Sequence, residues 1–262
     1  MDVEGPGANV ATVEHRLVDE RLSALLARFG EERPDACCAG AAGAEVPAAR
    51  SRLRELLERR LPGCRVSVVH DTRLVLAAAG LDAGIVLIAG TGSVAYARAA
   101  DGREARRGGW GWLVGDEGSG TWIAREAARA VLARADDGLE LGPLGAKLLA
   151  ACRAEDAEAL KASLHELRES GRWAALASAV FESEAADPAA RAIIVHAAEA
   201  LAALVTPLCD LIAGPVVLAG GLLLHRPSLE NAVRERLAFD CLRLEQPPVE
   251  GAVRLAEALL AR

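Results

Sequence analysis

The sequence is poor in aromatic residues, which supply only 3% of its 262 positions. Its apolar fraction is nevertheless 52%, and alanine accounts for much of that fraction. A core built largely from small side chains favours close packing of helices with few large aromatic anchors. Charged residues make up 26% of the chain, which is the balance of a globular protein rather than a disordered one.

The chain also lacks a basic cluster that stands clear of neighbouring acids, and its formal net charge is −7. The densest basic stretch, residues 50–60, alternates with Glu55 and Glu58 and is typical of the solvated face of a helix. Binding to nucleic acid needs a concentrated basic surface, so we expect no nucleic-acid partner. A nucleotide ligand is not excluded, because a few backbone amides and a metal ion can hold it.

Signals for export or membrane insertion are missing as well. Residues 1–7 include Asp2 and Glu4 and lack the apolar core of a signal peptide. The longest apolar run, residues 211–224, is too short and too interrupted by glycine and proline to span a bilayer. The six cysteines show neither CxxC spacing nor a secretory context, which predicts reduced thiols. We therefore expect a cytoplasmic protein with no membrane partner.

Short apolar strands, glycine loops and amphipathic helices alternate along the chain, which is typical of an α/β fold. Strands are predicted at residues 35–40, 65–70, 85–89, 94–99, 104–107, 215–219 and 242–244. Helices are predicted at residues 13–29, 47–61, 74–81, most of 120–213, 228–237 and 249–260.

Three of the predicted strands run into glycine-containing loops. Strand 85–89 precedes GTGS, strand 215–219 precedes Gly220-Gly221, and a third strand near Cys38 precedes a Gly/Ala loop. Ligands gather at the carboxyl ends of strands in an open α/β sheet, and glycine lets backbone amides approach phosphate oxygens. GTGS by itself is a weak signal, since many tight turns have the same composition.

The segment 108–122, GGWGWLVGDEGSGTW, is far more specific. Trp110 and Trp112 could stack on a sugar ring, and a carboxylate such as Asp116 could accept from two hydroxyls. The alternative is a rigid turn whose tryptophans belong to the core. For Trp122, at the start of a predicted helix, we favour the core role.

Together, IAGTGS, GGWGxxxGDEGSGxW and VVLAGG resemble the N-acetylglucosamine kinase and BadF/BadG/BcrA/BcrD ATPase family, within the sugar-kinase and actin-like ATPase superfamily. The resemblance covers essentially the whole chain, and GDEGSG is its most specific element. It implies a two-lobed α/β fold of the actin-like ATPase (ribonuclease H-like) type with an incomplete N-terminal lobe. That lobe would be residues 1–81, with the last helix, 251–262, packing back on it; residues 82–250 would form the C-terminal lobe.

The resemblance also implies a role for each motif residue. Asp71, at the end of strand 65–70, would be the catalytic base, although spacing alone makes such an aspartate more often a cap. The phosphate and nucleotide contacts would come from Gly90, Thr91, Gly92, Ser93, Gly220 and Gly221. The sugar contacts would come from Asn9, Gly109, Trp110, Gly111, Asp116 and Glu117.

The activity implied by this resemblance is ATP-dependent phosphorylation of an amino sugar, N-acetylglucosamine or glucosamine at the 6-hydroxyl, by a homodimer that uses ATP and Mg²⁺. Asp71 would take the proton of the attacking hydroxyl, while Mg²⁺ and loop amides stabilise the charge. The residues leave the acceptor open among N-acetylglucosamine, glucosamine, N-acetylmuramic acid and glucose. No set of protein metal ligands can be assigned, since the histidines show no metal spacing.

One family motif, the Asp-Gly-Gly-Gly-Thr hairpin of the first phosphate loop, has no counterpart in this sequence. We expect either a gene start assigned too late or a short form that is catalytically impaired and serves as a sugar-binding or regulatory relative. A third function, an activator ATPase with an iron–sulfur cluster at a dimer interface, needs closely placed cysteines. It is disfavoured, because none lies between Cys64 and Cys152.

Overall fold

The computed structural model describes residues 10, 13–29, 33–237 and 239–261. The chain forms two compact units, one made of residues 1–82 and 244–262 and the other of residues 83–243. Both combine strands with helices, so the chain is α/β as the sequence predicted.

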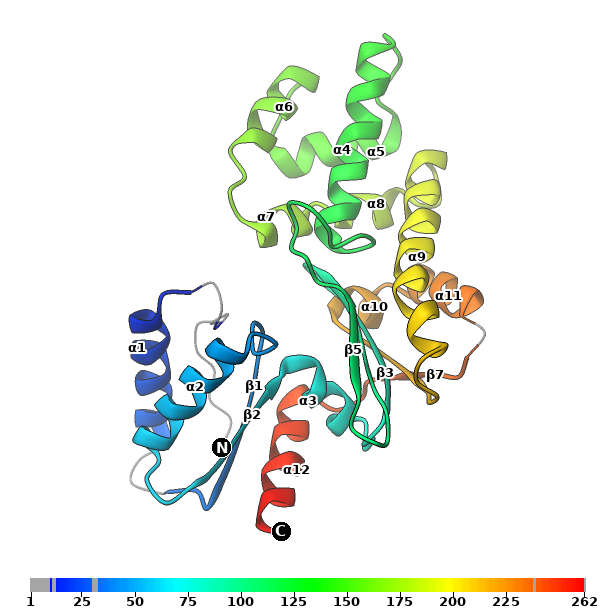
Figure 1. Ribbon diagram of the computed structural model, residues 1–262. Coiled ribbons are helices and arrows are strands. Elements are labelled where there is room, and N and C mark those ends of the chain that lie inside the picture. The colour runs from blue at the N-terminus through cyan, green and yellow to red at the C-terminus, as the bar shows by residue number, and fades with distance from the viewer. Residues whose placement is uncertain (1–9, 11–12, 30–32, 238, 262) are drawn as a thin grey trace. The chain divides into compact units, whose positions relative to one another are not determined.

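The first unit is built on two parallel strands, which pair from Ala36 with Arg65 to Ala41 with His70. Helices α1 and α2 lie on one side of these strands, and α3 and α12 lie on the other (Figure 1). Its elements are α1 (His15–Leu26), a 3₁₀ turn (Ala27–Phe29), β1 (Ala36–Ala41), α2 (Pro47–Arg60), β2 (Arg65–His70), α3 (Asp71–Ala78) and α12 (Pro248–Leu260).

Helix α3 is enclosed by its neighbours so tightly that only glycine fits at two of the contacts. A Cβ on Gly40 of β1 would lie 2.3 Å from Leu74 Cδ1, and a Cβ on Gly251 of α12 would lie 2.0 Å from Leu74 O. Arg254 of α12 donates from Nη1 to Ala77 O at 2.9 Å, which satisfies a carbonyl at the end of α3. The helix that begins at Asp71 is therefore held on two sides and at its C-terminus.

Two predictions for this unit were wrong in detail. The helix predicted at 74–81 begins three residues earlier, because His70 forms its N-cap and the carboxylate of Asp71 accepts from Thr72 N at 2.9 Å. The apolar composition of residues 35–40 predicts a buried strand, but β1 is half-buried along its whole length. Its Cys37 is a free thiol whose pKa burial raises to about 11, so it stays protonated at neutral pH.

The second unit contains a five-stranded sheet in the order β5-β4-β3-β6-β7. Strands β3, β4 and β5 form an antiparallel meander, whereas β6 runs parallel to both β3 and β7. The strands are β3 (Gly84–Ala89), β4 (Ser93–Arg98), β5 (Glu104–Gly108), β6 (Val216–Ala219) and β7 (Cys241–Arg243).

Helices pack on this sheet and gather at one end of it (Figure 1). Those at the end are α4 (Gly120–Asp136), α5 (Gly142–Cys152), α6 (Ala157–His165), α7 (Ser170–Ala175) and α8 (Ser178–Ser183). The others are α9 (Pro188–Cys209), α10 (Gly221–His225) and α11 (Pro227–Arg236), of which the short α10 was not predicted from the sequence.

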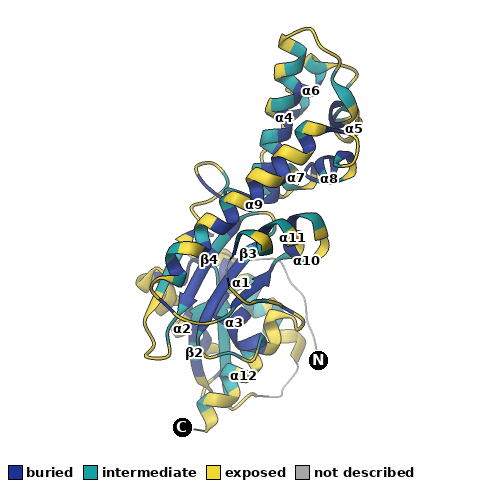
Figure 2. Ribbon diagram, turned by 90° about the vertical axis from the view of Figure 1, so that its right-hand side faces the viewer, coloured by how far each residue is buried: buried dark blue, intermediate teal, exposed yellow. Residues whose placement is uncertain are grey.

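The core of the second unit joins the sheet to α9. Figure 2 shows β3, β4 and the adjoining side of α9 as buried, and Leu87, Leu201 and Val205 belong to one apolar cluster. Helix α9 is long and apolar enough to cross a membrane, with a mean hydropathy of 1.8 over a stretch that is 44% buried. Core helices pass the same test of length and composition, so this finding is weak evidence for a membrane span.

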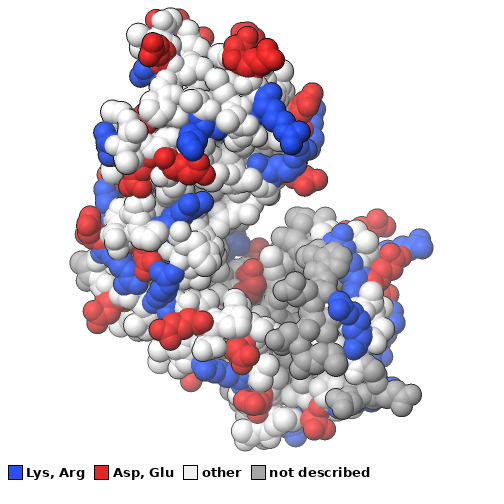
Figure 3. Space-filling model, turned by 180° about the vertical axis from the view of Figure 1, so that it is seen from behind, with Lys and Arg blue, Asp and Glu red and all other residues white. Residues whose placement is uncertain are grey.

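Among the described residues on the face in Figure 3, basic and acidic side chains are interspersed. Many exposed arginines have an acidic neighbour on the same helix, such as Arg54 with Glu58 and Arg16 with Glu20, both at 3.0 Å. Pairs of this kind on a helix surface contribute little to stability and leave little uncompensated charge.

Candidate functional site

Two of the predicted glycine segments meet at one edge of the large sheet. Strands β3 and β6 are parallel neighbours with Ile88 opposite Ala219, so the segments that follow them emerge side by side. Gly220 has a φ of +89°, and a Cβ on it would lie 2.4 Å from the carbonyl oxygen of Ala89. A Cβ on Gly90 would have Gly221 N, at 3.8 Å, as its nearest contact. Glycine at 220 is therefore required for the two segments to lie this close.

Hydrogen bonds fasten the GTGS loop, residues 90–93, to the GDEGSG segment. Ser93 Oγ donates to Glu117 O at 2.8 Å. Gly120 N donates to Gly90 O at 2.8 Å. Thr121 Oγ1 donates to Thr91 O at 2.9 Å, and Thr91 itself is exposed. Two motifs that are separate in the sequence are therefore one structural element.

The end of the GDEGSG segment begins helix α4 and packs it against α9. Ser119 is the N-cap, and its Oγ accepts from Trp122 N at 3.2 Å. Gly118 has a φ of +77°, and a Cβ on it would lie 2.7 Å from Ala197 O of α9. Trp122 packs against the apolar core of the second unit, in the place predicted for it. The small residues in GSG thus have a packing reason that does not depend on any ligand.

Asp116 is the buried carboxylate of this region. It is 8% exposed, and its φ of +58° is rare for a residue other than glycine. A Cβ on Gly92 would lie 2.6 Å from Asp116 Oδ2, so this loop glycine leaves the space that the carboxylate fills. The GTGS loop therefore packs directly against Asp116, the residue predicted to bind the sugar.

The charge of Asp116 is set by opposing influences. Burial raises the pKa of its carboxyl, and the neighbouring Glu117 adds to that increase. Backbone hydrogen bonds from Ser93 and Gly111 and the charge of Arg125 oppose the increase without cancelling it. A carboxylate in this state benefits from further donors, such as hydroxyl groups, which would favour its ionised form.

Arg125 is a residue of this site that the sequence did not indicate. From the second turn of α4 it donates to Trp112 O at 2.6 Å and to Gly115 O at 3.4 Å. Both acceptors are backbone carbonyls of the loop before Asp116, so no side-chain motif marks the contact. Arg125 therefore anchors the backbone of the loop that carries Asp116.

The first part of the loop is open. Trp110 is 71% exposed, and the guanidinium of Arg106 lies 5.3 Å above its ring, within the range of a cation–π contact. Gly109 and Gly111 have φ values of +68° and +91°, and Gly109 N donates to Ser93 O at 3.0 Å. The same loop therefore presents an exposed aromatic ring, Trp110, and a buried carboxylate, Asp116, which are the types of group that can hold a sugar.

Asp71 lies in the first unit at the N-terminus of α3, and its side chain is 45% exposed. Its Oδ1 lies 3.0 Å from Nδ1 of His70, whose Nε2 lies 3.4 Å from Glu45 Oε2. The dipole of the buried helix α3 favours negative charge at this end. Asn9, the other predicted residue of this unit, falls outside the described residues.

In the described part of the chain, no group of three or more His, Cys, Asp or Glu residues is placed to hold a metal ion. Mg²⁺ does not need such a cluster in a nucleotide site, because phosphates, water and one or two carboxylates are its usual ligands there.

A model of the BadF/BadG/BcrA/BcrD ATPase family matches residues 4–253, which is most of the chain. The chain belongs to this family. The membership agrees with the resemblance inferred from IAGTGS and GDEGSG.

Two curated relatives are kinases by name. An N-acetylmuramic acid/N-acetylglucosamine kinase of Clostridium acetobutylicum is 37% identical over 136 residues, which cover 49% of this chain and 44% of the relative. An N-acetyl-D-glucosamine kinase of Dictyostelium discoideum is 36% identical over 78 residues, which cover 29% of this chain and 24% of the relative. The matches therefore span less than half the length of these relatives.

Solved structures agree on the fold. A candidate N-acetylglucosamine kinase from Chromobacterium violaceum superposes with a TM-score of 0.76 and 28% identity, covering 96% of this chain and 88% of that one. A ROK family glucokinase from Streptomyces griseus, in complex with glucose and AMPPNP, gives a TM-score of 0.60 and 15% identity over 95% and 89% of the two chains. The chain has the fold of the sugar kinases and actin-like ATPases, as predicted.

Proposed function

We propose that this protein is an ATP-dependent kinase of amino sugars that phosphorylates N-acetylglucosamine or glucosamine at the 6-hydroxyl. The observation that carries the proposal is the fastening of the GTGS loop to the GDEGSG segment, with the buried Asp116 against Gly92. A phosphoryl donor and an acceptor must be held within a few ångströms of each other. A single structural element that joins the proposed phosphate loop to Asp116, the proposed sugar-binding carboxylate, would meet that requirement.

The donor side of the site suits ATP. Gly90, Thr91, Gly92 and Ser93 would hold the terminal phosphates, and Gly220 and Gly221 would contact the adenosine. The close approach of Gly220 to Ala89 and of Gly90 to Gly221 leaves backbone rather than side chains along this edge. Phosphate oxygens are commonly bound by backbone amides in such glycine loops.

The acceptor side is the loop before α4. The buried carboxylate of Asp116 would accept from two sugar hydroxyls, which would offset the cost of its burial. Trp110 would cover an apolar face of the ring. The remaining predicted contacts, Asn9, Gly109, Gly111 and Glu117, complete the acceptor side of the proposal.

Asp71 would act as the catalytic base. Its carboxylate would accept the proton of the 6-hydroxyl as that oxygen forms a bond to the γ-phosphorus and the bond to the β–γ bridging oxygen breaks, which releases ADP. Mg²⁺, when bound, would neutralise charge on the phosphates. Helix α3, enclosed by Gly40 and Gly251, would keep the base in a fixed direction.

We propose a cytoplasmic homodimer whose partners are ATP and the amino sugar rather than nucleic acid or membrane. Residues 1–81, with the last helix 251–262, would form one lobe, and residues 82–250 would form the other.

The proposal is tested by measuring ADP release with ATP, Mg²⁺ and each of N-acetylglucosamine, glucosamine, N-acetylmuramic acid and glucose. At least one amino sugar should raise ADP release well above the rate without sugar, and its 6-deoxy analogue should not. Asp71→Asn should lower kcat by about 10²-fold or more, because general base catalysis contributes that much. Asp116→Ala should abolish sugar binding, as measured by calorimetry.

Folded protein that binds neither nucleotide nor any of these sugars would contradict the proposal. Phosphorylation at another hydroxyl, identified by NMR of the product, would retain the kinase and correct the position of transfer.

A further inference from the structure

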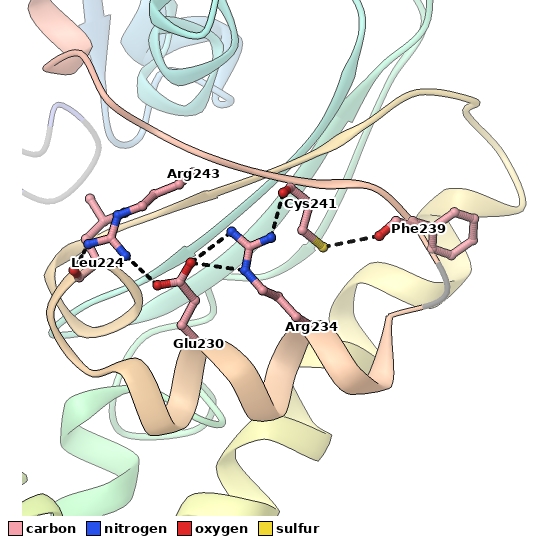
Figure 4. A network of polar contacts seen from close by, with 6 residues as sticks. All are labelled: Leu224, Glu230, Arg234, Phe239, Cys241 and Arg243. Atoms are coloured by element: carbon pink, nitrogen blue, oxygen red, sulfur yellow. Dashed lines mark hydrogen bonds and ion pairs between the residues drawn. The ribbon is translucent and has the colours of Figure 1, made fainter.

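A buried carboxylate outside the predicted site binds two arginines (Figure 4). Glu230 of α11 is 7% exposed. Its Oε1 accepts from Nη2 and Nε of Arg234 at 2.8 and 3.1 Å, and its Oε2 accepts from Nη1 of Arg243 at 2.5 Å. A buried carboxylate needs such partners. Glu230 therefore pairs with both arginines, with Arg234 through Oε1 and with Arg243 through Oε2.

The two arginines bind different segments of the backbone. Arg234 donates from Nη1 to Cys241 O of β7 at 2.6 Å. Arg243 donates from Nη2 to Leu224 O of α10. Figure 4 shows Arg243 between Glu230 and Leu224, and Arg234 between Glu230 and Cys241. Of these two arginines, only Arg243 hydrogen-bonds to α10.

From Leu224 the contacts continue to the glycine turn. Leu224 N donates to Gly220 O at 3.0 Å, and Gly220 lies against the carbonyl of Ala89 at the end of β3. Helix α10 has five residues, too few for its own hydrogen bonds to keep it in place. Its position therefore depends on outside anchors, and Arg243 is one of them.

We infer that Glu230 is a positioning residue for nucleotide binding: it orients Arg243, which holds Leu224 and thereby the turn at Gly220 and Gly221. This inference rests on the proposed function, which gives that turn its role. The hydrogen bonds of Glu230 go to Arg234 and Arg243, which are not among the residues predicted to contact ATP or the sugar. Glu230 acts on the donor side alone. Its loss should therefore weaken the binding of ATP and leave the sugar contacts around Asp116 as they are.

Two matched variants separate positioning from general stability. Arg243→Met keeps the apolar stem and removes the donor to Leu224 O, whereas Arg234→Met removes an arginine from the same carboxylate without touching α10. We expect Arg243→Met to raise the Kd for Mg·ADP, measured by calorimetry on the full chain, by about tenfold, which corresponds to about 1.4 kcal/mol. Arg234→Met should stay within about twofold. With ATP and sugar, KM for ATP should rise in Arg243→Met while KM for the sugar stays constant.

Glu230 itself is tested by two substitutions. Glu230→Ala should weaken Mg·ADP at least as much as Arg243→Met, and Glu230→Gln, which keeps one acceptor oxygen, should restore part of the affinity. Glu199→Gln is the control, because it removes the charge from an exposed ion pair between Glu199 and Arg236 of α11, at 3.4 Å. It should leave Mg·ADP affinity unchanged.

Hydrogen exchange of nucleotide-free protein makes the result independent of the proposed function. Arg243→Met should speed exchange in residues 220–225 more than Arg234→Met does. Equal effects of the two variants on exchange and on Mg·ADP would overturn the inference. Faster exchange in a protein whose wild type binds no nucleotide would uphold the anchor and overturn the proposed function.

Discussion

Replacing Gly251 with alanine should destabilise the first unit, because the new Cβ has no room. It would lie 2.0 Å from Leu74 O and 2.7 Å from Ala78 N, both backbone atoms of α3. A Cβ essentially never lies closer than 3.0 Å to another non-bonded heavy atom, so α12 must move away from α3 by about 1 Å or more. No change of side-chain rotamer can relieve an overlap with backbone.

The magnitude follows from two opposing effects. Overpacking costs up to about 3 kcal/mol, and sometimes more. Alanine in place of glycine in a helix interior returns about 1 kcal/mol. The net loss is therefore about 2 kcal/mol, which lowers the melting temperature of a unit of roughly 100 residues by about 10 °C.

The assay uses the distribution of the tryptophans, which are residues 110, 112, 122 and 173 and all belong to the second unit. Their fluorescence follows the unfolding of that unit, while far-ultraviolet circular dichroism follows helices of both. Gly251→Ala should add or shift an early transition in circular dichroism and leave the fluorescence transition in place.

The control is Gly171→Ala, the same substitution at a helical glycine with no atom within 4 Å of the added Cβ. It should keep or slightly raise stability, in line with helix propensity. An unchanged or higher melting temperature of Gly251→Ala in circular dichroism would refute the packing argument.

Three further predictions concern the second unit. Gly92→Ala places a Cβ 2.6 Å from Asp116 Oδ2 and should raise KM for the sugar at least tenfold, as measured in the ADP-release assay; an unchanged KM would show that the position of the carboxylate is not critical. Thr121→Val removes the hydroxyl that bonds Thr91 O and should lower the stability seen by tryptophan fluorescence in urea by about 1–2 kcal/mol, whereas no loss would mean that the two loops are not held by this bond. Asp116→Asn should abolish sugar binding but stabilise the unit at pH 7, because the pKa of Asp116 is raised by burial and the ionised form is disfavoured in the fold; the gain should vanish as the pH falls below about 3.9, and melting curves from pH 7 to pH 3 that show no such trend would contradict the raised pKa.

Much of the local structure could be predicted because it depends on short-range patterns. The strands at 65–70 and 85–89 and the helices at 47–61 and 249–260 differ from the structure by at most one residue at either end. The family could also be inferred from sequence, since GTGS and GDEGSG retain their composition and spacing. Those motifs are tied to backbone geometry, as the positive φ values of Asp116 and Gly118 illustrate.

Other features depend on chain segments that meet only after folding. The start of α3 at Asp71 depends on a cap by His70, and its environment depends on glycines 40 and 251, which are more than 200 residues apart. Arg125 and Glu230 looked like ordinary charged residues of helices. Their partners are backbone carbonyls and arginines brought near by strand pairing and helix packing.

The amino-acid sequence by itself determined the fold class, the family and the chemical types available at the loops, because hydrophobic period, glycine content and motif spacing are local properties. The tertiary structure decided that the GTGS loop and Asp116 share one element, and that Glu230 reaches α10 through Arg243. The physical reason is that burial and hydrogen bonding depend on distances between residues far apart in the chain. Those distances exist only once β3, β6 and the helices around them have packed.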